Sequence, residues 1–159
     1  MSAIKNTSWK ILFSTFLLLI FFSCSSKEEK NTDQLHEEID YIVLSYVGGQ
    51  SGSYKIIKIK KDSLYLEKGS AANHTHREQR VAINNMLWKK IVSPLDIENL
   101  DLIESSPSIQ SVDGIDETFQ IKTTKKSHVY VNAYNDTVHY KRLQNMKNEL
   151  EKILPKEYR

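Results

Sequence analysis

Thr118–Thr123, with the sequence TFQIKT, alternates apolar and polar side chains, the pattern of a strand with one buried face. After a turn at Lys125-Lys126, a second β-rich run follows over His128–Asn132, HVYVN. Two such runs joined by a short polar turn predict a β-hairpin. We expect Phe119 and Val129 on its buried face and His128 on its polar face.

Upstream of this hairpin, three further runs predict an antiparallel meander. Ile39–Val47 is rich in β-branched and aromatic residues, and the glycine-rich segment Gly48–Ser53 ends it with a turn. Tyr54–Lys60 alternates between isoleucine and lysine, and a second turn leads to Leu64–Leu66. Residues 69–73 are expected to form a loop, and residues 77–83 are a candidate fourth strand.

Two segments change to a helical period. Leu87, Trp88, Ile91 and Val92 are spaced for a helix that starts at residue 85 and stops before Pro94. A second apolar stripe, from Tyr140 to Leu154, predicts a helix capped by residues 135–137.

The connecting segments have their own signals. We expect a short helical turn over Asp96–Ile103 with Asp96 as its cap, and a long surface loop over Ser105–Asp116. The sequence therefore predicts an α+β domain with an antiparallel sheet of about five to six strands and two helices packed on one face. That face is expected to carry Ile57 and Leu64 together with Phe119 and Val129.

The N-terminus has the order of a secretory signal. Lys5 and Lys10 precede an apolar run, Ile11–Phe22, which is followed by the small Ser23 and the only cysteine, Cys24. The twelve residues of this run make a helix of about 18 Å, too short to cross a hydrocarbon core of about 30 Å. We expect a signal peptide at 1–23, a flexible polar tether at 24–36 and a single domain at 37–159.

The segment Phe21-Phe22-Ser23-Cys24 resembles the lipobox of bacterial lipoproteins. The resemblance implies cleavage between Ser23 and Cys24, diacylglycerol on the Cys24 thiol and acylation of the freed amine. An ordinary cleaved signal and an uncleaved N-terminal anchor are the alternatives. Lys27-Glu28-Glu29 resembles the export signal of some Gram-negative surface lipoproteins, which implies a domain on the outer face of the outer membrane; the periplasmic face of that membrane is the alternative.

Charge and cysteine content limit the function classes. Signal cleavage removes two of the 22 basic residues and none of the 20 acidic ones, so the mature chain has no formal net charge. This balance argues against a nucleic-acid partner. Once Cys24 carries lipid, no cysteine remains for a disulfide or a thiolate metal site.

Five short segments suggest chemistry, and each also has a plainer explanation. His74-Thr75-His76 could place two imidazoles on one metal, but it lacks a third ligand nearby and fits solvated histidines. Asp113–Glu117 looks like part of a calcium loop, but its upstream residues lack the required oxygens, which favours a turn. Gly48–Gly52 joins two strands with no following helix N-terminus, so it is a hairpin tip and not a phosphate cradle. Asp62-Ser63-Leu64 and Asp136-Thr137-Val138 resemble O-glycosylation acceptors, although turn chemistry explains both aspartates.

The order of elements around Gly48-Gly49 and Trp88, with the hairpin from Thr118 and the C-terminal helix, resembles emfourin-type inhibitors of thermolysin-like metalloproteases. The insertion at Glu67–Arg80 departs from that family. Three hypotheses follow: a lipid-anchored, non-catalytic binding module for an unknown protein or glycan; an anchored protease inhibitor acting through Gly48–Ser53 or Ser105–Glu117; and an enzyme or metal protein. The sequence favours the first. It indicates no catalytic residues, no metal ligands and no cofactor.

Overall fold

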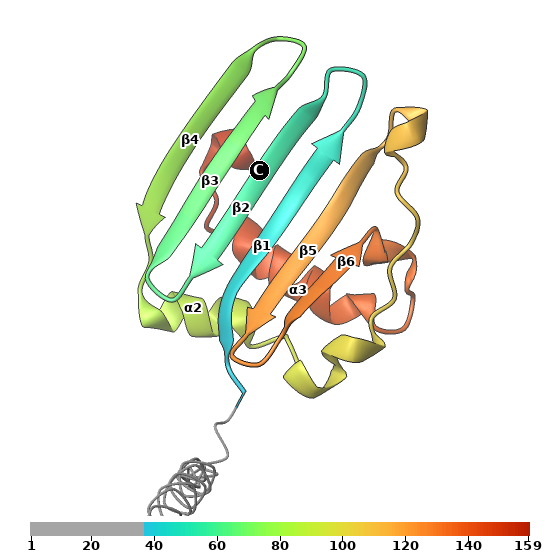
Figure 1. Cartoon of the computed structure of the whole chain (residues 1–159). Coiled ribbons are helices and arrows are strands. Elements are labelled where there is room, and N and C mark those ends of the chain that lie inside the picture. Colours follow the sequence, from blue (N-terminus) through green and yellow to red (C-terminus); the bar gives the residue numbers. More distant parts are fainter. Residues whose placement is uncertain (1–36) are drawn as a thin grey trace, which may run out of the picture. The chain divides into compact units, whose positions relative to one another are not determined.

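Six antiparallel strands form one sheet in the computed structural model, which describes residues 37–159 (Figure 1). Their order across the sheet is β4-β3-β2-β1-β5-β6. The strands are β1 (Ile39–Gly48), β2 (Ser53–Lys60), β3 (Ser63–Ser70), β4 (Thr75–Ala82), β5 (Ile115–Thr123) and β6 (Ser127–Val131). The hairpin at residues 118–132 is therefore confirmed as β5 and β6, which pair antiparallel at one edge of the sheet.

Two α-helices accompany the sheet, α2 (Asn85–Val92) and α3 (Tyr140–Glu151), and both lie behind it in the view of Figure 1. Four 3₁₀ turns complete the described chain: η1 (Ile97–Leu102), η2 (Gln110–Val112), η3 (Ala133–Asn135) and η4 (Lys156–Tyr158). The α+β class is thus confirmed, with six strands and two helices in the described residues.

The core lies between the sheet and the helices, and the strand register arranges it in rows. Leu44 of β1 faces Ile57 of β2 on one side and Phe119 of β5 on the other. Ile42 is flanked in the same way by Ile59 and Ile121 one pleat further along. The helices cover these two rows with buried side chains: Trp88 and Ile91 of α2, and Leu143, Met146 and Leu150 of α3. Burial of these rows is the main force that holds the sheet against the helices.

The faces assigned to β6 were wrong. Val129 is 55% exposed on the uncovered face, whereas His128 is 6% exposed and lies with Tyr130 on the face toward the core. The register explains this, because Tyr130 pairs with Phe119 and His128 pairs with Ile121, which are both core residues. Tyr130 satisfies its hydroxyl there by donating to the Leu100 carbonyl at 2.6 Å.

The meander is longer than its sequence signal. Strand β3 continues to Ser70 and β4 begins at Thr75, so the loop expected at residues 69–73 is reduced to a tight turn. Gly69 makes the continuation possible, because a Cβ at this position would lie 2.6 Å from the Tyr54 hydroxyl. The Tyr54 ring therefore fills the space that glycine leaves, a known way to stabilise glycine within a sheet.

The expected helix caps were partly correct. Asp96 precedes η1 but its side chain makes no capping bond, and it instead accepts from the Asn99 amide at 2.6 Å and pairs with Arg142. Asp136 does satisfy backbone donors just before α3: its carboxylate accepts hydrogen bonds from the N–H groups of Val138 and His139 at 3.0 and 2.8 Å. Its hydrogen bonds, with that to His139 first, lower the Asp136 pKa to about 2.

Candidate functional site

A row of polar side chains crosses the covered face of the sheet beside the two apolar rows. Tyr46 of β1 pairs with Glu117 of β5 and with Lys55 of β2. Lys55 in turn pairs with Lys68 of β3, and Lys68 pairs with Arg77 of β4. These cross-strand neighbours therefore form one continuous row across five strands, with an acidic residue at one end and three basic residues at the other. We call it the polar row.

The acidic end of the polar row is satisfied internally. Glu117 is buried, and its carboxylate lies 2.5 Å from Lys147 Nζ of α3 while accepting a 2.7 Å hydrogen bond from the Tyr140 hydroxyl. Burial raises the pKa of Tyr46, and the Glu117 carboxylate raises it further. These groups form a closed structural network that fastens α3 to β5.

The basic end of the polar row has a different kind of partner. Lys55 donates to the Tyr158 carbonyl and Lys68 to the Glu157 carbonyl, both in the C-terminal turn η4. Lys55 Nζ lies 4.6 Å from the centre of the Tyr46 ring, and Lys68 Nζ lies 4.9 Å from that of Tyr158. Both lysines are thus held in place by carbonyl oxygens and aromatic faces, which carry no net charge.

A cavity of about 640 Å³ opens at this basic end. It is lined by Tyr54, Lys55, Lys68, Gly69, His74, Thr75, His76 and Arg77, which include no carboxylate. A second groove, of about 620 Å³, lies between the first residues of β1, the β2–β3 turn and α2. Its Lys61 is already paired with Glu38 at 2.8 Å, so it offers less free charge to a ligand than the basic end does.

The loop before β5 is held rigidly by one buried carboxylate. Asp116 accepts from Ser108 Oγ at 2.5 Å, from the Ile109 backbone N–H at 2.9 Å and from the Asn132 amide at 2.8 Å. Burial alone would raise the Asp116 pKa, but the hydrogen bonds from these partners outweigh it and hold the pKa below its usual range. Asn132 also donates to the Pro107 carbonyl, so the loop is tied to the end of β6 as well.

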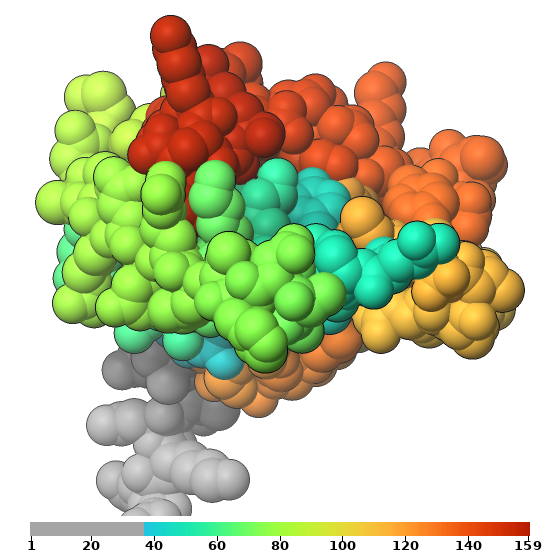
Figure 2. Space-filling view, turned by 90° about the horizontal axis from the view of Figure 1, so that it is seen from above, coloured from blue at the N-terminus to red at the C-terminus, as the bar shows by residue number. Residues whose placement is uncertain are grey.

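The glycine turn after β1 packs against the same loop. The Gly49 N–H donates to the Gly114 carbonyl at 3.0 Å, and a Cβ on Gly48 would lie only 2.1 Å from that oxygen. Seen from above, the teal turn at residues 49–52 lies beside the gold loop (Figure 2). Glycine is needed here for close approach and for a φ of +136° at Gly48.

Exposed apolar side chains gather where the two loops meet. Val112, in the loop after Ile109, is 77% exposed, and Ile115, the first residue of β5, is 50% exposed. A Cβ on Gly49 would lie 3.7 Å from Ile115, and one on Gly114 would lie 2.5 Å from Ile109, so these residues surround the glycine contact. We call Ile109, Val112 and Ile115 the tip surface.

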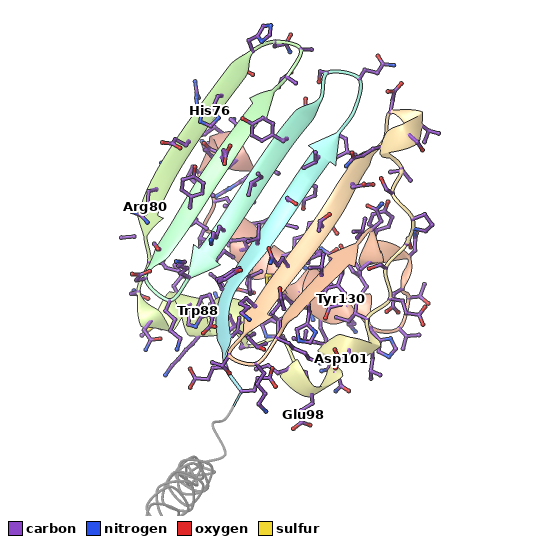
Figure 3. The ribbon with its side chains drawn as sticks, in the orientation of Figure 1. His76, Arg80, Trp88, Glu98, Asp101 and Tyr130 are labelled. Carbon is purple, nitrogen blue, oxygen red and sulfur yellow. The ribbon has the colours of Figure 1, made fainter. Side chains whose placement is uncertain are left out.

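The other face of the sheet has no helix over it within the described part of the chain, and Figure 1 looks onto it. His76 and Arg80 come from β4 on this face (Figure 3). It carries a mixture of half-buried aromatic, apolar and charged residues, among them Tyr41, Val43, Ile56, Lys58 and Tyr65. Several are already satisfied, as Lys58 lies over the Tyr41 ring and the Tyr65 hydroxyl donates to Glu78.

The histidines do not converge. His74 is exposed in the β3–β4 turn with a φ of +47°, and His76 Nδ1 lies 2.9 Å from the Tyr54 hydroxyl. His128 and His139 lie elsewhere, against Asp101 and Asp136 respectively. Among residues 37–159, no group of three histidine, cysteine or acidic side chains is placed to hold a metal.

The acidic turn at Asp113–Glu117 was expected at the surface, and only part of it is there. Asp113 is exposed with a left-handed backbone, whereas Asp116 and Glu117 are buried and face separate networks. The sequence contains one indication of a buried acidic partner: Lys147 falls on the apolar side of α3, four residues after Leu143. The basic end of the polar row was not anticipated.

The predicted cleavage, lipid-attachment and export-signal residues lie outside the described residues: Ser23, Cys24, Lys27, Glu28 and Glu29. Of the two acceptor motifs, Ser63 donates to Asp62 in the β2–β3 turn, and Thr137 is exposed beside the buried Asp136. In the part of the chain that is described, no helix has the length and hydropathy to cross a membrane.

No protein-family model matches the chain, and no curated protein matches it either. The fold and the surfaces described above are therefore the basis for inferring function.

Proposed function

We propose that the chain is a lipid-anchored cell-envelope protein whose domain is a non-catalytic binding module. The anchor rests on the lipobox-like segment that ends at Cys24. The binding role rests on the tip surface, where exposed Val112 lies in the loop that Asp116 orders and exposed Ile115 begins β5 beside it. Exposed apolar side chains on a rigid loop bind a partner at low entropic cost, because little must be ordered on association. We therefore propose a protein partner for this surface.

Site-specific photo-crosslinking in cells tests the binding role. A benzophenone residue at Val112 should yield a discrete crosslinked protein, which Ile115→Asp should abolish. Met86 is the matched control position, because it is 80% exposed on α2, far along the chain from the tip surface. Identical crosslinking patterns at Val112 and Met86, or none at Val112, would overturn the assignment of the tip surface.

Metabolic labelling tests the anchor separately. Radiolabelled palmitate should enter the wild-type chain and be absent from Cys24→Ser. Replacement of Lys27, Glu28 and Glu29 by alanine should make the domain inaccessible to added protease while palmitate incorporation continues. Labelling that persists in Cys24→Ser would exclude the proposed lipid attachment.

An anchored inhibitor of a thermolysin-like metalloprotease is the second candidate function. The observation that favours it is the contact between Gly49 and Gly114, which joins the two loops expected to inhibit into one rigid unit. Rigid exposed loops are the usual contact elements of protease inhibitors, whose backbones move little on binding. The chain should then abolish peptide cleavage at one equivalent, and Val112→Asp should relieve the inhibition. Full protease activity at a large excess of intact chain would remove this candidate.

A further inference from the structure

The basic end of the polar row places like charges directly opposite one another. Lys55, Lys68 and Arg77 are cross-strand neighbours on three adjacent strands. Directly opposed like charges destabilise a sheet. In residues 37–159, no carboxylate lies within 4.0 Å of any of the three to offset this repulsion.

Electrostatics around Lys55 agree with this placement. Burial lowers the Lys55 pKa, Glu151 partly offsets that effect, and Lys147 and Lys68 lower the pKa further. Arg77 is exposed and its guanidinium has no hydrogen-bond partner among the described residues. Lys55, Lys68 and Arg77 are all among the residues that line the cavity of about 640 Å³; the two ammonium groups are held by carbonyls of η4, and the guanidinium is unengaged.

We propose that this cavity binds a phosphate-bearing ligand through Lys55, Lys68 and Arg77. Three cations call for a multiply charged anion, and the phosphate group supplies several strong acceptor oxygens in a compact unit. Arg77 suits it because a guanidinium donates two parallel hydrogen bonds to phosphate oxygens. Adjacent strands are about 4.8 Å apart, so the three side chains start from a span of about 10 Å. Pyrophosphate or a phosphate monoester on a larger molecule fits that span.

This inference goes beyond the binding module proposed above. The basic end lies on β2, β3 and β4, whereas the tip surface belongs to the loop before β5 and to the first residue of β5. The two sites share no residue, so a variant that abolishes binding at one leaves the other unchanged. Each proposal can therefore be refuted independently.

Calorimetric titration of inorganic pyrophosphate into the full chain, held in neutral detergent micelles, tests the site. We expect saturable one-site binding that Arg77→Gln weakens about tenfold or more, through loss of a charge-assisted contact. Arg80→Gln is the matched control, because it removes the same charge from the same strand on the opposite face. It should change affinity less than about twofold. Lys68→Gln should weaken binding as well, with near-ultraviolet circular dichroism confirming that each variant is folded.

Two outcomes would overturn the proposal: no saturable heat at millimolar pyrophosphate, or equal weakening by Arg77→Gln and Arg80→Gln. A competition arm identifies the source of the phosphate. Displacement of pyrophosphate by micelles that contain phosphatidic acid, and not by phosphatidylcholine alone, would assign the site to a lipid headgroup. If pyrophosphate stays bound in the presence of either kind of micelle, the site is assigned to a soluble phosphate compound. Either result supports a phosphate site.

Discussion

Replacement of Lys147 by methionine is the sharpest test of the polar row as a structural element. Methionine keeps most of the apolar stem of lysine but removes the ammonium group that lies 2.5 Å from the Glu117 carboxylate. The side chains of Glu117 and Lys147 are only 7% and 18% exposed. The variant would therefore leave a buried carboxylate without its cationic partner, still accepting the hydrogen bond from the Tyr140 hydroxyl.

The size of the effect follows from burial. Removing one partner of a fully buried ion pair costs about 3–5 kcal/mol. Because the Lys147 end is still partly open to water, we expect Lys147→Met to lower the free energy of unfolding by about 2–3 kcal/mol. For a domain of this size that loss lowers the melting temperature by about 8–12 °C. Urea denaturation followed by circular dichroism measures the first quantity, and thermal denaturation measures the second.

Two companion variants make the test specific. Lys152→Met breaks an ion pair with Glu149 just after the end of α3, but Lys152 is 60% exposed, so the expected loss is below about 0.5 kcal/mol. The double variant Glu117→Gln and Lys147→Met removes both charges and should be less destabilised than Lys147→Met alone. Two outcomes would show that the buried pair does not hold α3 to the sheet. One is an equal loss of unfolding free energy in Lys147→Met and Lys152→Met. The other is a loss in the double variant as large as the sum of the losses in its two single variants.

Three further changes probe other parts of the domain. Gly48→Ala should cost about 2–3 kcal/mol in urea denaturation, because its Cβ would lie 2.1 Å from the Gly114 carbonyl oxygen at a backbone φ of +136°; an unchanged midpoint would contradict the close contact. Asp136 has a folded pKa of about 2, so its contribution of about 2 kcal/mol is present above the unfolded pKa near 4 and is lost as pH falls toward 2; Asp136→Asn should flatten the stability profile in that window, and a parallel profile would refute it. Burial, with Lys126, lowers the pKa of His128 against the opposing effects of Asp101 and Glu37, so the neutral form stabilises the fold and stability falls as pH drops below about 6.5. His128→Leu should remove that fall between about pH 7 and 5, and persistence of the fall would assign it to another group.

Local patterns in the sequence were enough for the class of the fold. Alternation along Thr118–Thr123 and helical spacing around Trp88 depend on neighbours within one element, and both were confirmed. The face of β6 was not accessible in this way. Val129 and Tyr130 are adjacent and both favour strands, so their chemistry does not say which side of the sheet each one faces. Pairing of Tyr130 with Phe119 settles the question, and that pairing is a property of the register.

The basic end of the polar row was hidden for a related reason. The short turn between Ile59 and Leu64 does fix the β2–β3 register, and it places Lys55 opposite Lys68. Extending the row to Arg77 requires β3 to run through Gly69, which local propensity argues against. The strand continues because Tyr54, from a neighbouring strand, covers the glycine. The position of the third cation of the candidate site therefore depends on a tertiary contact, which the pattern of a single segment does not predict.

The direction of β1 indicates which phosphate source, a lipid headgroup or a soluble compound, binds at the basic end. The described chain begins at Glu37, two residues before β1, and the polar row crosses β1 at Tyr46. Those nine residues of extended backbone separate the two by about 30 Å. If Cys24 carries the lipid, the roughly 13 residues from Cys24 to His36 attach the domain by the end of β1 that is remote from the basic end. We therefore expect pyrophosphate to survive competition by phosphatidic acid; displacement by that lipid would show that the domain lies with its basic end against the membrane.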